Sequence, residues 1–152
     1  MLSKKAKYGV RALLHLGTRY GGGPVMIKEI ADKESIPKKF LEAILLEMRD
    51  AGILHSRPGK GGGYILQRPP KTISMGRVIR LLDGPLAPIP CVSQTAYAPC
   101  SDCVEEDKCV IRGIMKQVRD ATAHILDGTT LEDLIENQKR YQETPLVMDF
   151  NI

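Results

Sequence analysis

The sequence lacks tryptophan, contains only two phenylalanines and five tyrosines among its 152 residues, and has no long apolar run. Aromatic side chains are most common in strands, so their scarcity predicts an aliphatic, mainly helical core. A helix that crosses a membrane needs roughly 18 or more consecutive apolar residues. The sequence therefore argues against a membrane protein.

Cysteine is absent outside residues 91–109, where all four cysteines occur with the spacing C-x8-C-x2-C-x5-C. This stretch is too polar and too rich in proline for a core helix or strand. Thiolates are soft ligands that suit zinc and iron–sulfur centres, so the spacing indicates that the cysteines converge on one metal or cluster. Reversible disulfide chemistry, or thiols without a role, are the alternatives that spacing alone leaves open.

The first 17 residues combine basic and apolar side chains, as a secretory signal peptide does. Arg11 and His15 interrupt the apolar stretch, and no small-residue cleavage site follows. We therefore expect a helix here and a cytoplasmic protein. In that reducing compartment, clustered cysteines act more often as ligands or sensors than as structural disulfides.

Charge is distributed unevenly along the chain. Residues 1–70 carry 13 Lys and Arg against 6 Asp and Glu, whereas residues 71–152 carry 9 against 12. The first half therefore has the stronger attraction for a polyanion such as DNA. A basic surface is often only a solvated face. The charge alone therefore does not establish DNA binding, and a sequence motif for DNA binding is needed as well.

Apolar spacing in residues 1–52 predicts three helices. The first runs from Lys4 to about Arg19 behind a Ser3 cap, and the second runs from Met26 to about Lys33. The third has Ser35 or Ile36 in its cap region and ends at Gly52. The expected apolar face of the first helix is Val10, Leu13, Leu14 and Gly17, and that of the third is Phe40, Leu41, Ile44, Leu45 and Met48.

Two short strands, Ile53–Arg57 and Tyr64–Gln67, follow with a glycine-rich loop between them. Two short helices and a hairpin are typical of a winged helix-turn-helix, whose second helix enters the major groove of DNA. That helix presents its polar residues away from the apolar stripe, and the hairpin tip is basic. The residues concerned are Lys38, Lys39 and Glu42 on the helix, and Arg57, Lys60 and Arg68 on the hairpin. The structural alternative for the hairpin tip is a plain glycine-rich turn.

The expected organisation is a DNA-binding domain at 1–70, a short helix and proline-rich linker at 71–90, a cysteine loop at 91–109, a long helix at 107–127 that Asp107 caps, and a C-terminal helix with a tail at 128–152. Apolar residues recur every three or four positions along the long helix and form a narrow seam. They are Ile111, Ile114, Val118, Ala121 and Ile125. Such a seam needs a partner, which we expect to be a second copy of the chain in a two-fold dimer. The alternative is packing against its own winged helix.

Several stretches together resemble the IscR/NsrR-type family of winged-helix transcription regulators, several of which hold an iron–sulfur cluster. The resemblance extends to about Tyr141 and rests on the opening SKKAKYGVRALLHL, the helix-turn-helix IKEIADKESIPKKFLEAILLEMRDAGIL, the wing RPGKGGGYIL, the helix ISMGRVIRLLDG and the cysteine loop. The combination is specific, whereas each motif alone is weak. The resemblance implies a mainly α fold with a small β-hairpin, a winged helix-turn-helix followed by a cysteine loop and a long dimerisation helix.

The resemblance also implies roles for individual residues. The predicted DNA-contacting residues are Lys28, Pro37, Lys38, Lys39, Phe40, Glu42, Arg57, Lys60, Gly61 and Gly62. Cys91, Cys103 and Cys109 match the three cysteines of the cluster-binding members. The chain departs from the family pattern at Cys100, which is additional, and at Arg112, where some members carry a ligating histidine. We therefore expect Cys100 to be the fourth ligand.

The predicted function is that of a dimeric regulator that binds a palindromic double-stranded DNA operator under control of a [4Fe-4S] or [2Fe-2S] cluster. It has no small-molecule substrate. Zinc bound by the same cysteines is a less favoured alternative, and a metal-free thiol–disulfide switch regulator is the main one. An enzyme is not expected, because Cys100 and Cys103 lack the βαβ surroundings of a redox dithiol. His15, His55 and His124 are scattered and look structural or exposed.

Overall fold

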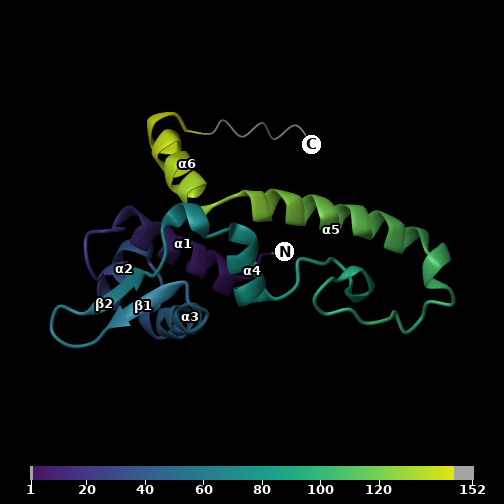
Figure 1. Cartoon of the computed structure of the whole chain (residues 1–152), viewed down its shortest axis with the longest axis horizontal. Coiled ribbons are helices and arrows are strands. Elements are labelled where there is room, and N and C mark those ends of the chain that lie inside the picture. Colours follow the sequence, from purple (N-terminus) through teal and green to yellow (C-terminus); the bar gives the residue numbers. More distant parts are fainter. Residues whose placement is uncertain (1, 146–152) are drawn as a thin grey trace.

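The computed structural model describes residues 2–145 of the chain. These residues form six α-helices and one two-stranded antiparallel sheet, which confirms the predicted winged helix-turn-helix of mainly α class. Figure 1 shows a winged-helix body from which one long helix reaches away, with the cysteine segment running beneath it. The elements are α1 (Lys4–Thr18), α2 (Ile27–Glu34), α3 (Lys38–Asp50), β1 (Leu54–Arg57), β2 (Gly63–Leu66), α4 (Met75–Asp83), α5 (Val110–Gly128) and α6 (Leu131–Glu143).

Helix α1 begins where Ser3 caps it, because the Ser3 hydroxyl accepts a hydrogen bond from the Ala6 N–H at 3.0 Å. Its predicted apolar face is only partly correct, since Leu13 and Gly17 are buried but Val10 and Leu14 are half-buried. The buried face is rotated toward small residues, which let other helices approach closely. It consists of Ala6, Gly9, Ala12, Leu13, Leu16 and Gly17.

The turn between α2 and α3 differs from the prediction. Ser35 ends α2 in a left-handed conformation (φ 52°) and does not cap α3, and Pro37 stands at the N-cap of α3. Pro37 suits that place because its ring fixes φ and its missing N–H would have had no partner in the helix. Between them, Ile36 is buried and anchors the turn in the core.

Helix α3 packs through Leu41, Ile44, Leu45 and Met48, all fully buried as predicted. Phe40, which was expected in the same stripe, is 40% exposed, so that part of the prediction is wrong. Its ring meets the Tyr8 ring edge to face, with centroids 5.7 Å apart. Phe40 therefore lies at the border between α1 and α3. Gly52 ends the segment at φ 71°, as expected of a left-handed glycine.

The hairpin pairs Leu54 with Leu66 and Arg57 with Gly63 at its two ends. Leu54, Tyr64 and Leu66 point into the core, and Val25 adds an isolated bridge to Tyr64 on the other side of β2. Gly63 is required here, because a Cβ atom would stand 2.2 Å from the Val25 carbonyl oxygen. Strand β2 is thus hydrogen-bonded to Val25, in the segment that precedes α2.

One core joins α1 to α4, the hairpin and the start of α6. Met75, Val78 and Leu82 bring α4 into it, and Leu131 contributes from α6. Within residues 2–145, no helix is both long enough and apolar enough to span a bilayer. The last seven residues of the predicted tail, 146–152, lie outside the described residues.

Helix α5 starts later than predicted. Asp107 lies in a short 3₁₀ turn, η3 (Glu106–Lys108), and the N-cap is Cys109, whose Sγ accepts from the Arg112 N–H at 3.4 Å. The predicted Asp107 cap is therefore wrong, because the 3₁₀ turn separates that side chain from the first turn of the helix. None of the residues of α5 is buried. Its C-terminal end is held to α4 by Arg80, whose guanidinium lies 2.5 Å from the Asp127 carboxylate.

Candidate nucleic-acid interface and cysteine segment

An open groove of about 380 Å³ lies between the start of α2, the start of α3 and the wing. It brings together five of the predicted DNA-contacting residues from these three parts of the chain. They are Lys28, Lys38, Glu42, Arg57 and Gly62. The other predicted residues, Pro37, Lys39, Phe40, Lys60 and Gly61, do not line it.

The basic side chains around this groove have no acidic partner. Among residues 2–145, no ion pair involves any of the lysines and arginines predicted to contact DNA. These are Lys28, Lys38, Lys39, Arg57 and Lys60. Because no described carboxylate holds them in an ion pair, these side chains are available to contact an anion.

The start of α3 adds to the positive character of the groove, and the start of α2 adds less because Glu29 lies in its first turn. The N-caps of α2 and α3, Met26 and Pro37, make no side-chain capping hydrogen bond. Helix N-termini carry N–H groups without partners and the positive end of the helix dipole, which together attract phosphate. Helix α3 has no acidic residue in its first turn that would offset this charge.

The wing glycines are explained by the geometry of the turn. Gly59 and Gly61 adopt positive φ, and a Cβ on Gly62 would lie 2.1 Å from the Arg57 carbonyl oxygen. The Gly62 N–H closes the turn by donating to the Gly59 carbonyl at 3.0 Å. Lys60, at the apex, is exposed.

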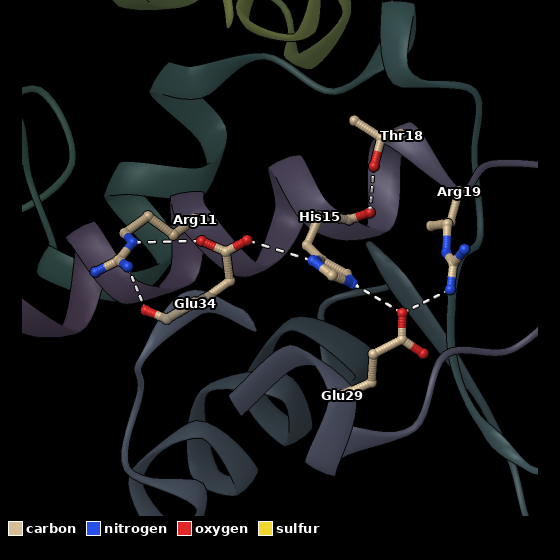
Figure 2. A network of polar contacts seen from close by, with 6 residues as sticks. All are labelled: Arg11, His15, Thr18, Arg19, Glu29 and Glu34. Carbon is tan, nitrogen blue, oxygen red and sulfur yellow. Dashed lines mark hydrogen bonds and ion pairs between the residues drawn. The ribbon is translucent and has the colours of Figure 1, made fainter. Parts of the chain in front are cut away.

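A chain of polar contacts fixes α2 against α1 (Figure 2). The imidazole of His15 lies 3.3 Å from a carboxylate oxygen of Glu29 at one ring nitrogen and 3.3 Å from one of Glu34 at the other. Arg19 and Arg11 flank these carboxylates, with Arg19 2.5 Å from Glu29. The expectation that His15 is structural is confirmed. The network therefore ties α2 to α1 at two points along its length.

The four cysteines differ sharply in their surroundings. Cys91 is buried in a 3₁₀ turn, η2 (Pro90–Val92), and Cys109 caps α5. Cys103 is partly exposed in the loop before η3, and desolvation together with the neighbouring Cys109 raises the pKa of its thiol. Cys100 is exposed, and its pKa is raised because its thiol donates to the Asp102 carboxylate at 3.0 Å.

Arg112 connects Cys91 to this helix start. Its Nε donates to the Cys91 carbonyl at 3.4 Å, while its backbone N–H donates to Cys109 Sγ. Glu106 lies 3.9 Å from Arg112 and accepts from the Tyr97 hydroxyl at 2.8 Å, which ties in the middle of the loop. Neither the Arg112 hydrogen bonds nor the Tyr97–Glu106 hydrogen bond was predicted from the sequence.

The donor set fits a thiolate-bound metal or cluster in its chemistry. The Cys109 sulfur caps α5 and the Cys91 carbonyl accepts from Arg112 in its first turn, whereas the Cys100 thiol is turned to Asp102. In the described part of the chain, no three or more Cys, His, Asp or Glu side chains are close enough together to bind one metal ion.

The apolar seam of α5 lies open to solvent. Ile111, Ile114, Val118 and Ile125 are between 42% and 64% exposed. Packing of the seam against the chain's own winged helix, the alternative weighed from the sequence, does not occur in this structure.

Comparison with known proteins identifies a family match over most of the chain. Residues 2–137 match the family model Rrf2, described as an iron-dependent transcriptional regulator. The rrf2-like HTH-type transcriptional regulator of Rhodobacter capsulatus is 41% identical over 138 residues, which cover 89% of this chain and 92% of that protein.

Solved structures agree with the sequence comparison. The structure of CymR, the global cysteine regulator of Bacillus subtilis, superposes with a TM-score of 0.75 at 34% identity, covering 90% of this chain and 97% of that one. That of T. potens IscR gives a TM-score of 0.75 at 30% identity, covering 93% and 90%.

Proposed function

This chain belongs to the Rrf2 family of transcriptional regulators, and from that membership we propose that it is a dimeric operator-binding protein controlled by an iron–sulfur cluster on residues 91–109. The observation that carries the DNA-binding part is the groove between α2, α3 and the wing, which unpaired basic residues line. The proposal assigns residues 1–70 to DNA binding, 91–109 to sensing and 107–127 to dimerisation.

The start of α3 enters the major groove in this proposal. Lys38, Lys39 and Glu42 are exposed on the face of α3 away from its buried stripe, where base edges and phosphates are within reach. Arg57 and Lys60 on the wing contact the backbone of the flanking DNA, and Lys28 contacts a phosphate beside the start of α2. Pro37, Phe40, Gly61 and Gly62 shape the surface at these points.

A second copy of the chain covers the α5 seam in the proposed dimer. The exposed side chains Ile111, Ile114, Val118 and Ile125 recur every three to seven residues along one face. A helix with such a stripe is stabilised by a partner helix of the same kind. A two-fold dimer would present two α3 helices to the matched half-sites of a palindromic operator.

Cys91, Cys103 and Cys109, with Cys100 as the fourth ligand, would hold the cluster. A bound cluster would supply a thiolate-ligated redox centre that orders the segment. This chain's own contribution is the positioning of the sulfurs. Cys109 is fixed at the N-cap of α5 and Cys91 is buried, whereas Cys100 would have to turn away from Asp102 and the sulfurs would have to move closer together to share a cluster.

A metal-free thiol–disulfide regulator is the second candidate function. It is favoured because the four cysteines are free thiols and no three ligating side chains among the described residues lie close enough to share one metal ion, whereas a disulfide needs only two thiols. Zinc bound by the same four thiolates is a further variant of the sensor.

The DNA-binding part is tested with the double variant Lys38→Ala/Lys39→Ala. Duplexes selected by the wild-type protein from a random library serve as the probe, and binding is measured by fluorescence anisotropy against salt. We expect weaker binding and a salt slope that is shallower by about 2, because each phosphate contact contributes about 0.9. Lys139→Ala/Arg140→Ala on α6 is the matched control. Equal binding by both variants would contradict the assignment of α3.

The sensor is tested by anaerobic purification, visible absorption, and iron, sulfide and zinc analysis of the wild type and Cys100→Ala. A brown protein with stoichiometric iron and sulfide is the expected result, and loss of colour in the variant supports Cys100 as a ligand. A colourless protein without iron, combined with a mass loss of two protons on oxidation, would instead establish the thiol switch.

A further inference from the structure

Only one short piece of the cysteine segment is packed. Between residues 84 and 128, all of which the structure describes, the only buried residues are Cys91, Val92 and Ser93. They form the turn η2 and the residue after it, and they lie against α5. The buried apolar surface of this turn is small, so other contacts must hold it in place.

Two arginines of α5 bind two consecutive carbonyl groups of this turn. Arg119 Nη1 donates to the Val92 carbonyl at 2.7 Å, and Arg112 Nε donates to the Cys91 carbonyl at 3.4 Å. The Arg119 side chain is 12% exposed, and its Nε also donates to the neighbouring Asp120 at 2.8 Å, which fixes its guanidinium plane. A charged donor on a nearly buried carbonyl makes a strong hydrogen bond.

The two arginines share one face of α5. They are seven residues apart, close to two helical turns, so both side chains leave the helix on the same side. At about 100° per residue, the apolar stripe of Ile111, Ile114, Val118 and Ile125 lies about 120° around the helix from them. The turn therefore docks on α5 without covering the stripe, which is left free for the second copy.

We propose that Arg119, assisted by Arg112, is a positioning residue that docks the Cys91 turn onto α5 and thereby holds the first sulfur of the segment at a fixed place beside the helix start. The inference rests on the proposed function only for the role of Cys91 in sensing. The docking itself follows from the two hydrogen bonds and the burial. Because the other cysteines are partly or fully exposed, Cys91 is the one whose accessibility depends on this contact.

The test measures how fast each cysteine is alkylated in the full-length, chelator-treated and reduced protein without DNA. Iodoacetamide is the probe, and mass spectrometry of peptides resolves the four sites. In Arg119→Ala we expect Cys91 to react about tenfold to a hundredfold faster than in the wild type, because a charge-assisted hydrogen bond no longer closes the turn. Cys100, Cys103 and Cys109 are expected to keep their rates.

Lys116→Ala is the matched control, because Lys116 lies on the same helix and pairs with the same Asp120 at 2.8 Å but does not contact the turn. Its Cys91 rate should equal that of the wild type. Arg119→Lys keeps the charge and should give an intermediate rate. A Cys91 rate in Arg119→Ala within twofold of the wild type would overturn the proposal.

Equal acceleration of all four cysteines would also overturn it, since that result marks general unfolding. Hydrogen exchange of the peptide around residues 88–96 gives a second measurement, in which Arg119→Ala should lose protection at this peptide alone. Neither readout involves DNA or a cluster. A regulator that binds its operator but shows no change at Cys91 would therefore refute the docking and leave the proposed function standing.

Discussion

Two regions of the molecule are stabilised by different means: the body, from α1 to α4, and the arm, residues 84–128, which holds the cysteine segment and α5. From α1 to α4 the chain buries a continuous set of apolar side chains, among them Leu13, Ile44, Leu45 and Val78, all fully inaccessible. From residue 84 to residue 128 only three consecutive residues are buried, and α5 buries none. Figure 1 shows the consequence, since α5 extends away from the body with little beside it except the cysteine segment.

This difference in packing predicts that the body is rigid and that the arm changes conformation more easily. Close packing specifies one arrangement of the winged-helix elements, because any displacement would open cavities. The arm depends on a few polar contacts, chiefly Arg119 to Val92, Arg112 to Cys91 and Arg80 to Asp127. A region of this kind opens at lower cost and can be reset by a partner helix or by chemistry at sulfur.

The largest expected effect compares two neighbouring leucines of α3. Leu45→Ala empties a fully buried position and should lower the free energy of unfolding by about 2–5 kcal/mol. Leu46→Ala, at a position 43% exposed, should cost less than about 1 kcal/mol. Urea denaturation followed by circular dichroism measures both. Similar losses from the two variants would mean that the body is not organised by its core.

The arm should show the opposite pattern, in which substitution changes association more than folding. Ile111→Glu/Ile114→Glu places two charges on the exposed stripe and should raise the dimer dissociation constant about a hundredfold or more, since each buried isoleucine is worth about 1.5–3 kcal/mol. Analytical ultracentrifugation over a concentration series measures it.

Lys116→Glu, on the opposite face of the same helix, is the control and should leave association unchanged. A wild-type protein that is monomeric at all concentrations would refute the proposed dimer outright. So would a double variant that dimerises as tightly as the wild type.

The body was largely predictable because local patterns decide it. Periodic apolar residues gave α3 its buried stripe from Leu41 to Met48, and the glycine-rich loop gave the hairpin. Errors arose where two local solutions compete. Phe40 fits an apolar stripe by spacing, yet the edge of α1 leaves its ring half outside against Tyr8. Ser35 is a residue type that often caps a helix N-terminus, but here it ends α2 in a left-handed conformation.

The contacts of the arm could not be predicted from the sequence for a different reason. Arg119 binds a carbonyl group 27 residues earlier in the chain. Every residue carries a carbonyl, so no residue type marks the acceptor. A sequence pattern could have pointed to the donor, since Arg112 and Arg119 share a face from which the apolar seam is absent. The cysteine positions were evident, but which of them lie together depends on the 3₁₀ turns η2 and η3.

The smallest expected effect lies where the two regions join, at Arg80 and Asp127. The hydrogen bond from Arg80 holds the pKa of Asp127 below its ordinary value in the folded protein. A depressed carboxyl pKa stabilises the fold at pH above the unfolded pKa, about 4, and this contribution disappears as the pH falls through the folded pKa. Because Asp127 is 48% exposed, the contribution should stay below about 1 kcal/mol.

Asp127→Asn should therefore lower the free energy of unfolding slightly at pH 7 and by less at pH 3, where part of the contribution has been lost, measured by urea denaturation at both values. Asp107→Asn is the control, since Asp107 is exposed and forms no ion pair with the described residues, so it should have no effect at either pH. An Asp127→Asn loss of the same size at pH 3 and pH 7 would show that packing, rather than the ion pair, joins the arm to the body. In that case the carboxylate would serve mainly to fill the space that Gly76 leaves open beneath it, where a Cβ atom would stand 1.9 Å from Asp127 Oδ1.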